Sequence, residues 1–387
     1  FGDGGRVDQV LLLDRLRSSG DLEAIGGMGY LAEVVQSVAV AAHAPKYAAI
    51  VANHAKRRRV IHEVTETLRR AYDDSEKPEA IATDAAERLL AVTTDSKPAT
   101  ANTAEVFAQA LDEATEPRTD RPIGFPVGLV SFDRDIGGLY RSELTILAAR
   151  PSMGKTALAT QLAVHFADRG LDALFISLEM SAGSLAKRIL AARAGVNSFA
   201  VRNGLVNADD RQRLRDAYEA LPVARLRIVD RHKMTVAEVR WEIMRTVRTG
   251  GVHLVVVDYL TRLQPADPRA QRYLQVGQLS GDLKRLALEF DVPVLCLAQL
   301  GRAAEGKGET RPRLSHLRES GDIEQDADVI GFLHRPERVD RNDGDVRGKA
   351  FLFVEKNRNG PVGDFVLRFD AATGVFTDPA ADVVDDF

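Results

Sequence analysis

Cysteine is almost absent from this 387-residue chain, in which Cys296 is the only one. A single thiol cannot form a disulfide within the chain, so a disulfide-stapled secreted domain is excluded and a reducing compartment is expected. Long apolar runs are missing too, since none reaches the roughly 20 residues that a membrane-spanning helix needs, and no cleavable signal is visible. We therefore expect a soluble, cytoplasmic protein that has no membrane partner.

A strong charge of either sign is also lacking. The 52 Lys and Arg residues and the 56 Asp and Glu residues leave a formal net charge of −4. A protein that nucleic acid coats over a broad face usually carries a marked positive balance, so that class is disfavoured. A local basic channel stays open as an alternative, because phosphate contacts depend on where the cations lie.

The chain is long enough for two or three domains. Residues 1–95 carry apolar side chains at helical spacing and predict a helical amino-terminal domain. The basic run 56–59 within it is interpreted as a solvated helix face rather than a nucleic-acid patch. Residues 96–122 are polar and proline-rich and predict a linker. The linker contains one short helix that is marginal alone in water, so we expect it to dock, on this molecule or on a neighbouring subunit, through Val106, Phe107, Ala110 and Leu111.

Residues 123–378 alternate short apolar runs with helical segments, and an acidic tail, residues 379–387, follows them. The runs are ELTILAA, ALFISLEM, RLRIVD, HLVVVDYL, PVLCLAQL, DVIGFLHR, KAFLFVEK and DFVLRF. Near-continuous apolar runs are typical of parallel strands buried on both faces, and helices between them imply right-handed crossovers. We predict an α/β domain with a mostly parallel central sheet flanked by helices, and an unstructured tail.

A phosphate-binding loop usually opens with a glycine, and this chain has Ala149 at that position of AARPSMGKTA. The segment nevertheless lies between a predicted strand and a predicted helix, where backbone N–H groups and the positive helix end can surround a polyphosphate. Gly154 lies where the backbone would approach the phosphates closely. Lys155 would reach the β- and γ-phosphates, and the Thr156 hydroxyl would bind Mg²⁺. The alternative is a chance Gly-Lys-Thr at the start of an ordinary helix, and the flanking elements favour a nucleotide site.

Three polar residues follow predicted strands and are expected at the same edge of the sheet. Asp258 ends VVVD, where its carboxylate could hold the Mg²⁺ shell through water. Glu179 follows FISL and could act as the general base for an attacking water. Gln299 ends LCLAQ, where a neutral amide could sense the γ-phosphate. The alternatives are surface acids at strand ends and a turn glutamine.

Cations gather in two later segments. Lys356 and Arg358 of EKNRNGPVG precede a Gly-Pro turn, and a flat guanidinium at a rigid turn suits the transition-state charge of phosphoryl transfer, in its own chain or in a neighbour's site. The alternative there is a solvated hairpin tip. The loop LGRAAEGKGETRPRLSHLRES mixes glycines with cations, so it could track a phosphate backbone or could be an ordinary solvated loop.

Taken in order, ARPSMGKTALA, SLEMS, VVVDYL, AQLGR, LRESGDIEQDADVI and KNRNGPVG resemble the motifs of the bacterial replicative DNA helicases of the DnaB type. The resemblance covers residues 123–375 and reaches LEAIGGMGYLAEVV in the helical part. It implies a RecA-like fold, a homohexameric ring, and ATP-driven 5′ to 3′ translocation on single-stranded DNA that unwinds duplex at the replication fork. It also implies that primase and a helicase loader bind through the amino-terminal domain.

The same resemblance assigns roles to individual residues. Glu179 would activate water, Gln299 would sense the γ-phosphate, and Lys356 and Arg358 would act in trans, Arg358 as the arginine finger. Thr156, and Asp258 through water, would hold the Mg²⁺. Residues that would bind the nucleotide are Ser152, Met153, Gly154, Lys155, Thr156, Ala157, Arg188 and Asp258, and those that would grip DNA are Arg318, Glu319 and Gly321.

The sequence departs from the family pattern in two places. Gly301 stands where the family usually has a polar residue after Gln-Leu, and the first helices of the family's amino-terminal domain have no counterpart. Ala149 is no departure, because the family often carries alanine there. The competing interpretations are a RecA-like recombinase that forms filaments and a nucleotide-gated loader or scaffold that does not unwind DNA.

Overall fold

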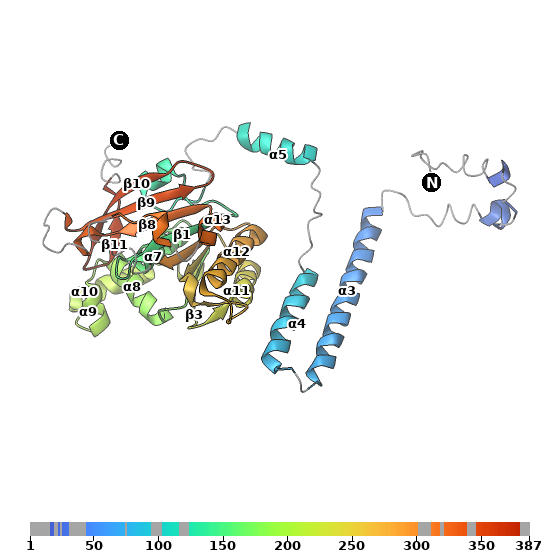
Figure 1. Cartoon of the computed structure of the whole chain (residues 1–387), viewed down its shortest axis with the longest axis horizontal. Helices are drawn as coiled ribbons and strands as arrows, with labels where there is room; N and C mark the ends of the chain where they lie inside the picture. Colours follow the sequence, from blue (N-terminus) through green and yellow to red (C-terminus); the bar gives the residue numbers. More distant parts are fainter. Residues whose placement is uncertain are drawn as a thin grey trace. The chain divides into compact units, whose positions relative to one another are not determined.

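The computed structural model describes residues 16–18, 22–23, 25–30, 44–73, 76–93, 103–115, 124–300, 311–317, 321–338 and 346–379. Nearly all of the predicted acidic tail therefore lies outside the described residues. The chain divides into two compact units, residues 1–116 and 117–387 (Figure 1). No helix within the described ranges is both long enough and apolar enough to cross a membrane.

The first unit is helical, as predicted. Helix α3 (Ala44–Ala71) and helix α4 (Pro78–Thr93) pack side by side as a hairpin (Figure 1). Arg70 near the end of α3 bonds Glu76 in the turn and Asp84 of α4, which ties the two helices together. Arg57–Arg59 are exposed on α3, so the solvated face stays a prediction.

Helix α5 (Thr103–Thr115) is the short helix predicted in the linker. Its Phe107 and Leu111 side chains are 72% and 62% exposed. Two large apolar side chains in water are a cost that docking would remove, so docking of α5 stays a prediction.

The second unit is built on a nine-stranded sheet whose order is β11-β10-β9-β8-β1-β7-β5-β2-β3. Six strands, from β8 to β3 in that order, run parallel. The bounds are β1 Leu144–Ala149, β2 Ala173–Ser177, β3 Leu226–Asp230, β5 Leu254–Asp258, β7 Val294–Gln299, β8 Val329–His334, β9 Lys349–Asn357, β10 Gly363–Asp370 and β11 Val375–Thr377. The predicted mostly parallel sheet is thereby confirmed.

The last strands depart from the parallel pattern. Strands β9, β10 and β11 are each antiparallel to their neighbours, so two of the runs predicted as parallel, KAFLFVEK and DFVLRF, pair in the antiparallel manner. The connections between β9 and β10 and between β10 and β11 are too short for a crossover helix, and antiparallel pairing is what a short turn permits.

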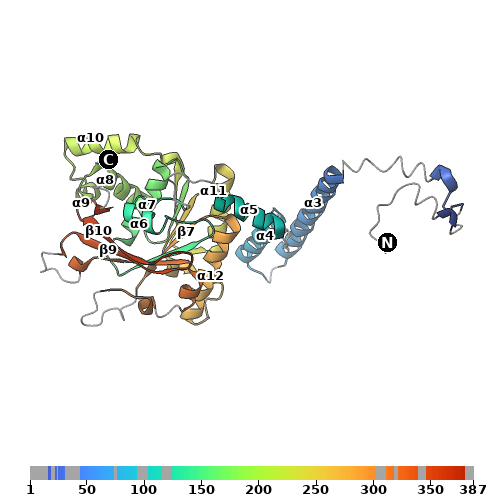
Figure 2. The same cartoon turned by 90° about the horizontal axis from the view of Figure 1, so that it is seen from above.

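Helices cover both faces of the sheet (Figure 2). One face packs on α11 (Val236–Thr249) and α12 (Arg272–Phe290), and the other on α6 (Val130–Asp135), α7 (Lys155–Asp168) and α8 (Ala182–Ala194). Alternate residues of β1 enter the two cores, Ile146 the first and Leu147 the second. Shorter elements complete the unit: α9 (Ser198–Asn203), α10 (Ala208–Glu219), α13 (Gly321–Asp326), β4 (Met234–Thr235) and β6 (Leu263–Gln264).

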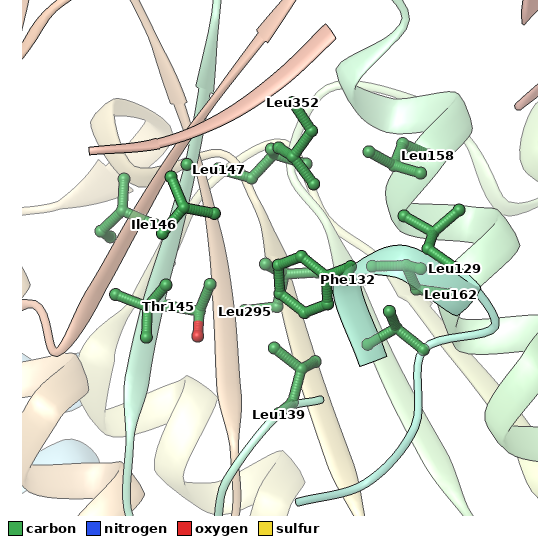
Figure 3. Close-up of a pocket in the computed structure, with 14 residues that line it drawn as sticks. Leu129, Phe132, Leu139, Thr145, Ile146, Leu147, Leu158, Leu162, Leu295 and Leu352 are labelled. Atoms are coloured by element: carbon green, nitrogen blue, oxygen red, sulfur yellow. The ribbon is translucent and has the colours of Figure 1, made fainter. Parts of the chain in front are cut away.

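The second core holds a small apolar cavity of about 30 Å³ between the sheet and α6 and α7 (Figure 3). Phe132, Leu158, Leu162 and Leu295 are among the side chains that line it. A space of this size holds about one water, and a water needs several polar partners. The cavity is therefore a packing defect of the core, and the candidate site lies elsewhere, at the carboxyl ends of the parallel strands.

Candidate active site

The phosphate-binding loop joins the end of β1 to the start of α7. Gly154 caps α7 with a φ of 96° and, as a glycine, has no side chain with which to bond the first-turn N–H groups of that helix. Met153 is 3% exposed and its side chain packs in the core, so only its backbone can face a ligand. Unpaired N–H groups at a helix start form an anion site.

At Gly154 the backbone lies close to another segment of the protein, strand β11. A Cβ atom added there would lie 2.8 Å from Cζ of Phe376 in β11. Gln161 of α7 fixes that strand, because its side chain donates to the Phe376 carbonyl at 2.7 Å and accepts from the Phe376 N–H at 2.9 Å. The loop thus rests on the last strand of the sheet, a contact between distant segments that the sequence did not reveal.

Lys155 extends over the ends of the neighbouring strands. Its Nζ lies 3.4 Å from the Ala298 carbonyl of β7 and 4.6 Å from the centre of the Tyr259 ring. Burial lowers the pKa of this ammonium, and Asp258 partly opposes that effect. A buried cation with such weak partners gains strongly from an incoming anion.

Thr156 and Asp258 form the adjoining pair. The Thr156 hydroxyl donates to Oδ2 of Asp258 at 2.8 Å, while Oδ1 of Asp258 is buried without a hydrogen-bond partner among the described residues. Burial raises the pKa of Asp258. A hydroxyl beside an unsatisfied carboxylate oxygen fits a hydrated Mg²⁺ ion, which keeps most of its water ligands.

Glu179 stands in the turn after β2, next to Asp258. Ser177, the last residue of β2, pairs with Asp258 across the sheet and bonds Met180 through its hydroxyl, donating to the carbonyl at 2.7 Å and accepting from the N–H at 3.1 Å. These bonds fix the turn that presents the exposed Glu179 carboxylate. Sequence reasoning missed Ser177, although a serine directly before a tight turn is a usable signal.

Arg188 and Gln299 complete this cluster. Burial lowers the pKa of Arg188 on α8, and the charges of Asp258 and Glu179 oppose the shift, which places the guanidinium near both acids. Gln299 ends β7 in register with Ala149 of β1, and its side chain is exposed. A pocket of about 240 Å³ between α7 and α8 adjoins the loop, with Ala157 and Arg188 in its wall.

The predicted cations Lys356 and Arg358 lie away from this cluster. Val329 of β8 pairs with both Thr145 of β1 and Asn357 of β9, so the turn that carries Arg358 is level with the start of β1. The phosphate loop leaves β1 at its other end, and at about 3.3 Å per residue the two points lie roughly 13 Å apart along the strands. Arg358 and the loop of the same subunit therefore face opposite edges of the sheet.

Both cations contact the end of α13 instead. Lys356 Nζ donates to the carbonyls of Glu324 and, at 2.7 Å, of Ala327. Arg358 donates to the Gln325 carbonyl at 2.6 Å and to Asp328 Oδ1 at 3.3 Å. Cations are favourable at helix carboxyl ends, so these contacts hold both side chains while no other acceptor is offered.

Of the three residues predicted to grip DNA, the structure describes Gly321. Gly321 is the first residue of α13. Arg318 and Glu319 lie outside the described residues, so their DNA-gripping role stays a prediction. Gly301, where the sequence departs from the family pattern, also lies outside them.

Comparison with known proteins identifies relatives over nearly the whole chain. Residues 124–378 match the model of the DnaB-like helicase C terminal domain, and residues 1–53 that of the DnaB-like helicase N terminal domain. The replicative DNA helicase DnaB of Geobacillus stearothermophilus is 34% identical over 371 residues, which are 95% of this chain and 82% of that protein. The replicative DNA helicase DnaB of Treponema pallidum is 35% identical over 95% of this chain and 83% of its own length.

Solved structures agree with these relatives. One of them, a separately solved ATPase domain, superposes with a TM-score of 0.67 at 32% identity and covers 72% of this chain and 99% of its own. A DnaB-like replicative helicase, whose structure was described together with its interactions with primase, gives a TM-score of 0.70 at 29% identity and covers 97% of this chain and 88% of its own.

Proposed function

This chain belongs to the family of DnaB-like replicative helicases, and we propose that it works as a ring of six subunits that moves 5′ to 3′ along single-stranded DNA. Family membership confirms the predicted ATP-dependent DNA helicase. The observation that carries the ring proposal is the separation of Arg358 from the Lys155 loop within one subunit. A finger that faces away from its own site can serve only the site of a neighbour.

The residues around the loop would divide the work of ATP hydrolysis. The first-turn N–H groups of α7 and Lys155 would hold the phosphates, and the pocket beside Arg188 has room for part of the nucleoside. Thr156 and Asp258 would hold Mg²⁺, which when bound neutralises phosphate charge. Glu179 would take a proton from the attacking water as that water forms a bond to the γ-phosphorus and the bond to the β-phosphate oxygen breaks.

The neighbouring subunit would supply the remaining charge. Arg358 and Lys356 would exchange the carbonyls of α13 for the oxygens of the transferred phosphoryl group, whose transition state spreads negative charge over those oxygens. Gln299 would bond the γ-phosphate until it leaves. Because α13 begins at Gly321, next to Arg318 and Glu319, movement at the finger would displace the loop that we propose grips DNA.

The proposed division of the chain is a helical domain (1–95), a linker (96–122), a RecA-like motor domain (123–378) and an acidic tail (379–387). The exposed Phe107 and Leu111 of α5 support docking of the linker on a neighbour. We assign primase and loader binding to the helical domain, and a related helicase has been solved with its primase interactions described.

Mixing two inactive variants tests the shared site. Lys155→Ala, Glu179→Ala and Arg358→Ala rings should each lose hydrolysis, Arg358→Ala by about 10³-fold or more. Mixed rings of Glu179→Ala and Arg358→Ala subunits should regain activity, because some seams then pair an intact acid with an intact finger. Mixing Lys155→Ala with Glu179→Ala is the control and should restore nothing, since both lesions lie on the same side of the seam.

The direction of movement has its own test. A forked duplex with a 5′ single-stranded tail should be unwound, and the same duplex with only a 3′ tail should not. Unwinding from the 3′ tail alone would reverse the proposed polarity.

A further inference from the structure

The turn that presents Arg358 is braced by the two asparagines beside it. Asn357 Nδ2 donates to the Pro361 carbonyl at 2.9 Å, and Asn357 Oδ1 accepts from the Asn359 N–H at 3.3 Å. A Cβ at Gly360 would lie 2.8 Å from Asn357 Nδ2, so the glycine permits the close crossing. The turn therefore behaves as one unit whose orientation depends on how it is attached to the sheet.

One attachment is a buried acid. Asn359 Nδ2 donates at 2.6 Å to Oε1 of Glu143, the residue before β1, which is 8% exposed. Burial raises the pKa of Glu143, and the hydrogen bond from Asn359 partly opposes that effect. A buried carboxyl is costly, and an apolar residue of the same volume would usually serve stability as well or better. The carboxyl gives Asn359 an acceptor that an apolar residue could not offer.

The second attachment is at Asp328. Its carbonyl accepts from the Arg358 N–H at 2.8 Å, and its Oδ2 accepts from the Leu144 N–H at 2.8 Å and from Lys284 Nζ at 2.6 Å. Asp328 thereby fixes the base of the turn, and Glu143 fixes its tip. Without the Glu143 bond, Asn359 would lose the side-chain bond that ties the tip of the turn to the start of β1.

We propose that Glu143, acting through Asn359, is a positioning residue that sets the direction in which Arg358 reaches the neighbour's nucleotide. This inference rests on the proposed function, since it needs Arg358 to act across a seam. A misplacement of about 1 Å can cost on the order of 10²-fold in rate. Loss of the Glu143 bond should therefore lower kcat by about 10- to 100-fold, less than loss of Arg358 itself.

The substitution Glu143→Met removes the acceptor and keeps the volume, and Glu143→Gln is the matched control that keeps an oxygen for Asn359. We expect Glu143→Met to lower kcat while KM for ATP and the affinity for a fluorescent ATP analogue stay unchanged, and Glu143→Gln to stay within about threefold of the wild type. Asn359→Ala, which removes the other partner of the bond, should lower kcat as much as Glu143→Met does. The double variant Glu143→Met/Asn359→Ala should lower kcat no further than either single variant, as expected for one shared interaction.

Mixed rings separate positioning from a general loss of structure. Glu143→Met mixed with Glu179→Ala should regain hydrolysis, because Glu143→Met subunits keep an intact acid and loop. Glu143→Met mixed with Arg358→Ala should regain none, since every finger is then defective. Rescue in the mixture of Glu143→Met with Arg358→Ala would overturn the role of Glu143 and leave the shared site standing. The same holds if Glu143→Met with Glu179→Ala is not rescued while Arg358→Ala with Glu179→Ala is. Failure of that last pair overturns the shared site and this inference with it.

Discussion

Gly154 of the phosphate loop contacts β11, the last strand of the sheet, and the substitution Gly154→Ala tests that contact. Its φ of 96° disfavours any side chain, and its Cβ would also meet Phe376. Gly154→Ala should destabilise the protein by about 1–3 kcal/mol through backbone strain, with a steric cost added. It should also weaken ATP binding. Gly170→Ala is the matched control, because Gly170 has a φ of 79° with no atom near its Cβ.

Urea unfolding and nucleotide titration measure both effects. Equal losses of unfolding free energy for the two variants would show that the Phe376 contact contributes nothing.

Asp258 shows the tension between stability and function. Its raised pKa means that the native state disfavours its charge, so the ionised group costs stability at neutral pH. Asp258→Asn should raise the unfolding free energy of the nucleotide-free protein at pH 7 while it abolishes hydrolysis. The gain should shrink as the pH falls through the raised pKa and vanish below 3.8, the ordinary value, because Asp258 is then protonated in both states. Urea unfolding across this range checks it, and a less stable variant at pH 7 contradicts it.

At the residue scale the sequence predicted that some of the candidate site residues end strands, and the structure places them there. Asp258 and Gln299 could be placed because each ends an apolar run, and parallel strands end at one edge. Glu143 and Asp328 could not be found, since their partners lie 216 and 30 residues away in the chain. An acid before a strand looks like a surface acid until the fold brings Asn359 to it.

At the element scale, the packing of α12 on α13 fixes the helix that follows the proposed DNA loop. A Cβ at Gly277 of α12 would lie 2.8 Å from Cβ of Asp322 in α13, whereas a Cβ at Gly281 would meet nothing closer than 3.5 Å. Gly277→Ala should push α13 away, at a cost of about 1–3 kcal/mol. Because the proposed DNA loop precedes α13, DNA-stimulated hydrolysis should fall several-fold while basal hydrolysis changes little.

Gly281→Ala is the control for that substitution, on the same helix and one turn further. Rates with and without single-stranded DNA make the comparison. A fall in basal hydrolysis alone would place the effect of Gly277 at the nucleotide site.

The direction of β9 determines on which edge of the sheet Arg358 lies, and the sequence alone did not show that direction. KAFLFVEK has the composition of a buried strand, but composition does not tell parallel from antiparallel pairing. Once β9 runs back along β8, its end carries Arg358 to the edge opposite Lys155. The residues alone left open whether Arg358 acts in its own chain or in a neighbour's site, and this register favours the neighbour's site, as the family resemblance implied.

At the scale of the whole molecule, a site completed by a neighbour depends on assembly. The specific rate of hydrolysis should rise steeply with protein concentration and level off once assembly is complete, because a lone subunit lacks the finger. Sedimentation measured with ATP and oligonucleotide at the same concentrations should show the assembly over the same range. Arg358→Ala is the control: it should assemble in the same way without the rise. A rate per subunit that is independent of dilution down to the monomer contradicts the shared site.

Strand β1 begins beside Glu143, which holds the turn of Arg358, and ends in the phosphate loop, so in the proposed shared site each copy would offer a donor surface and a different acceptor surface. Contacts of this head-to-tail kind are not self-complementary, and a two-fold dimer cannot satisfy them. An open row of subunits always leaves one pocket without its arginine, whereas a closed cycle leaves none. Closure of the ring would thus complete the last ATPase site. A ring that opens to admit DNA would leave one ATPase site without its arginine while it stays open.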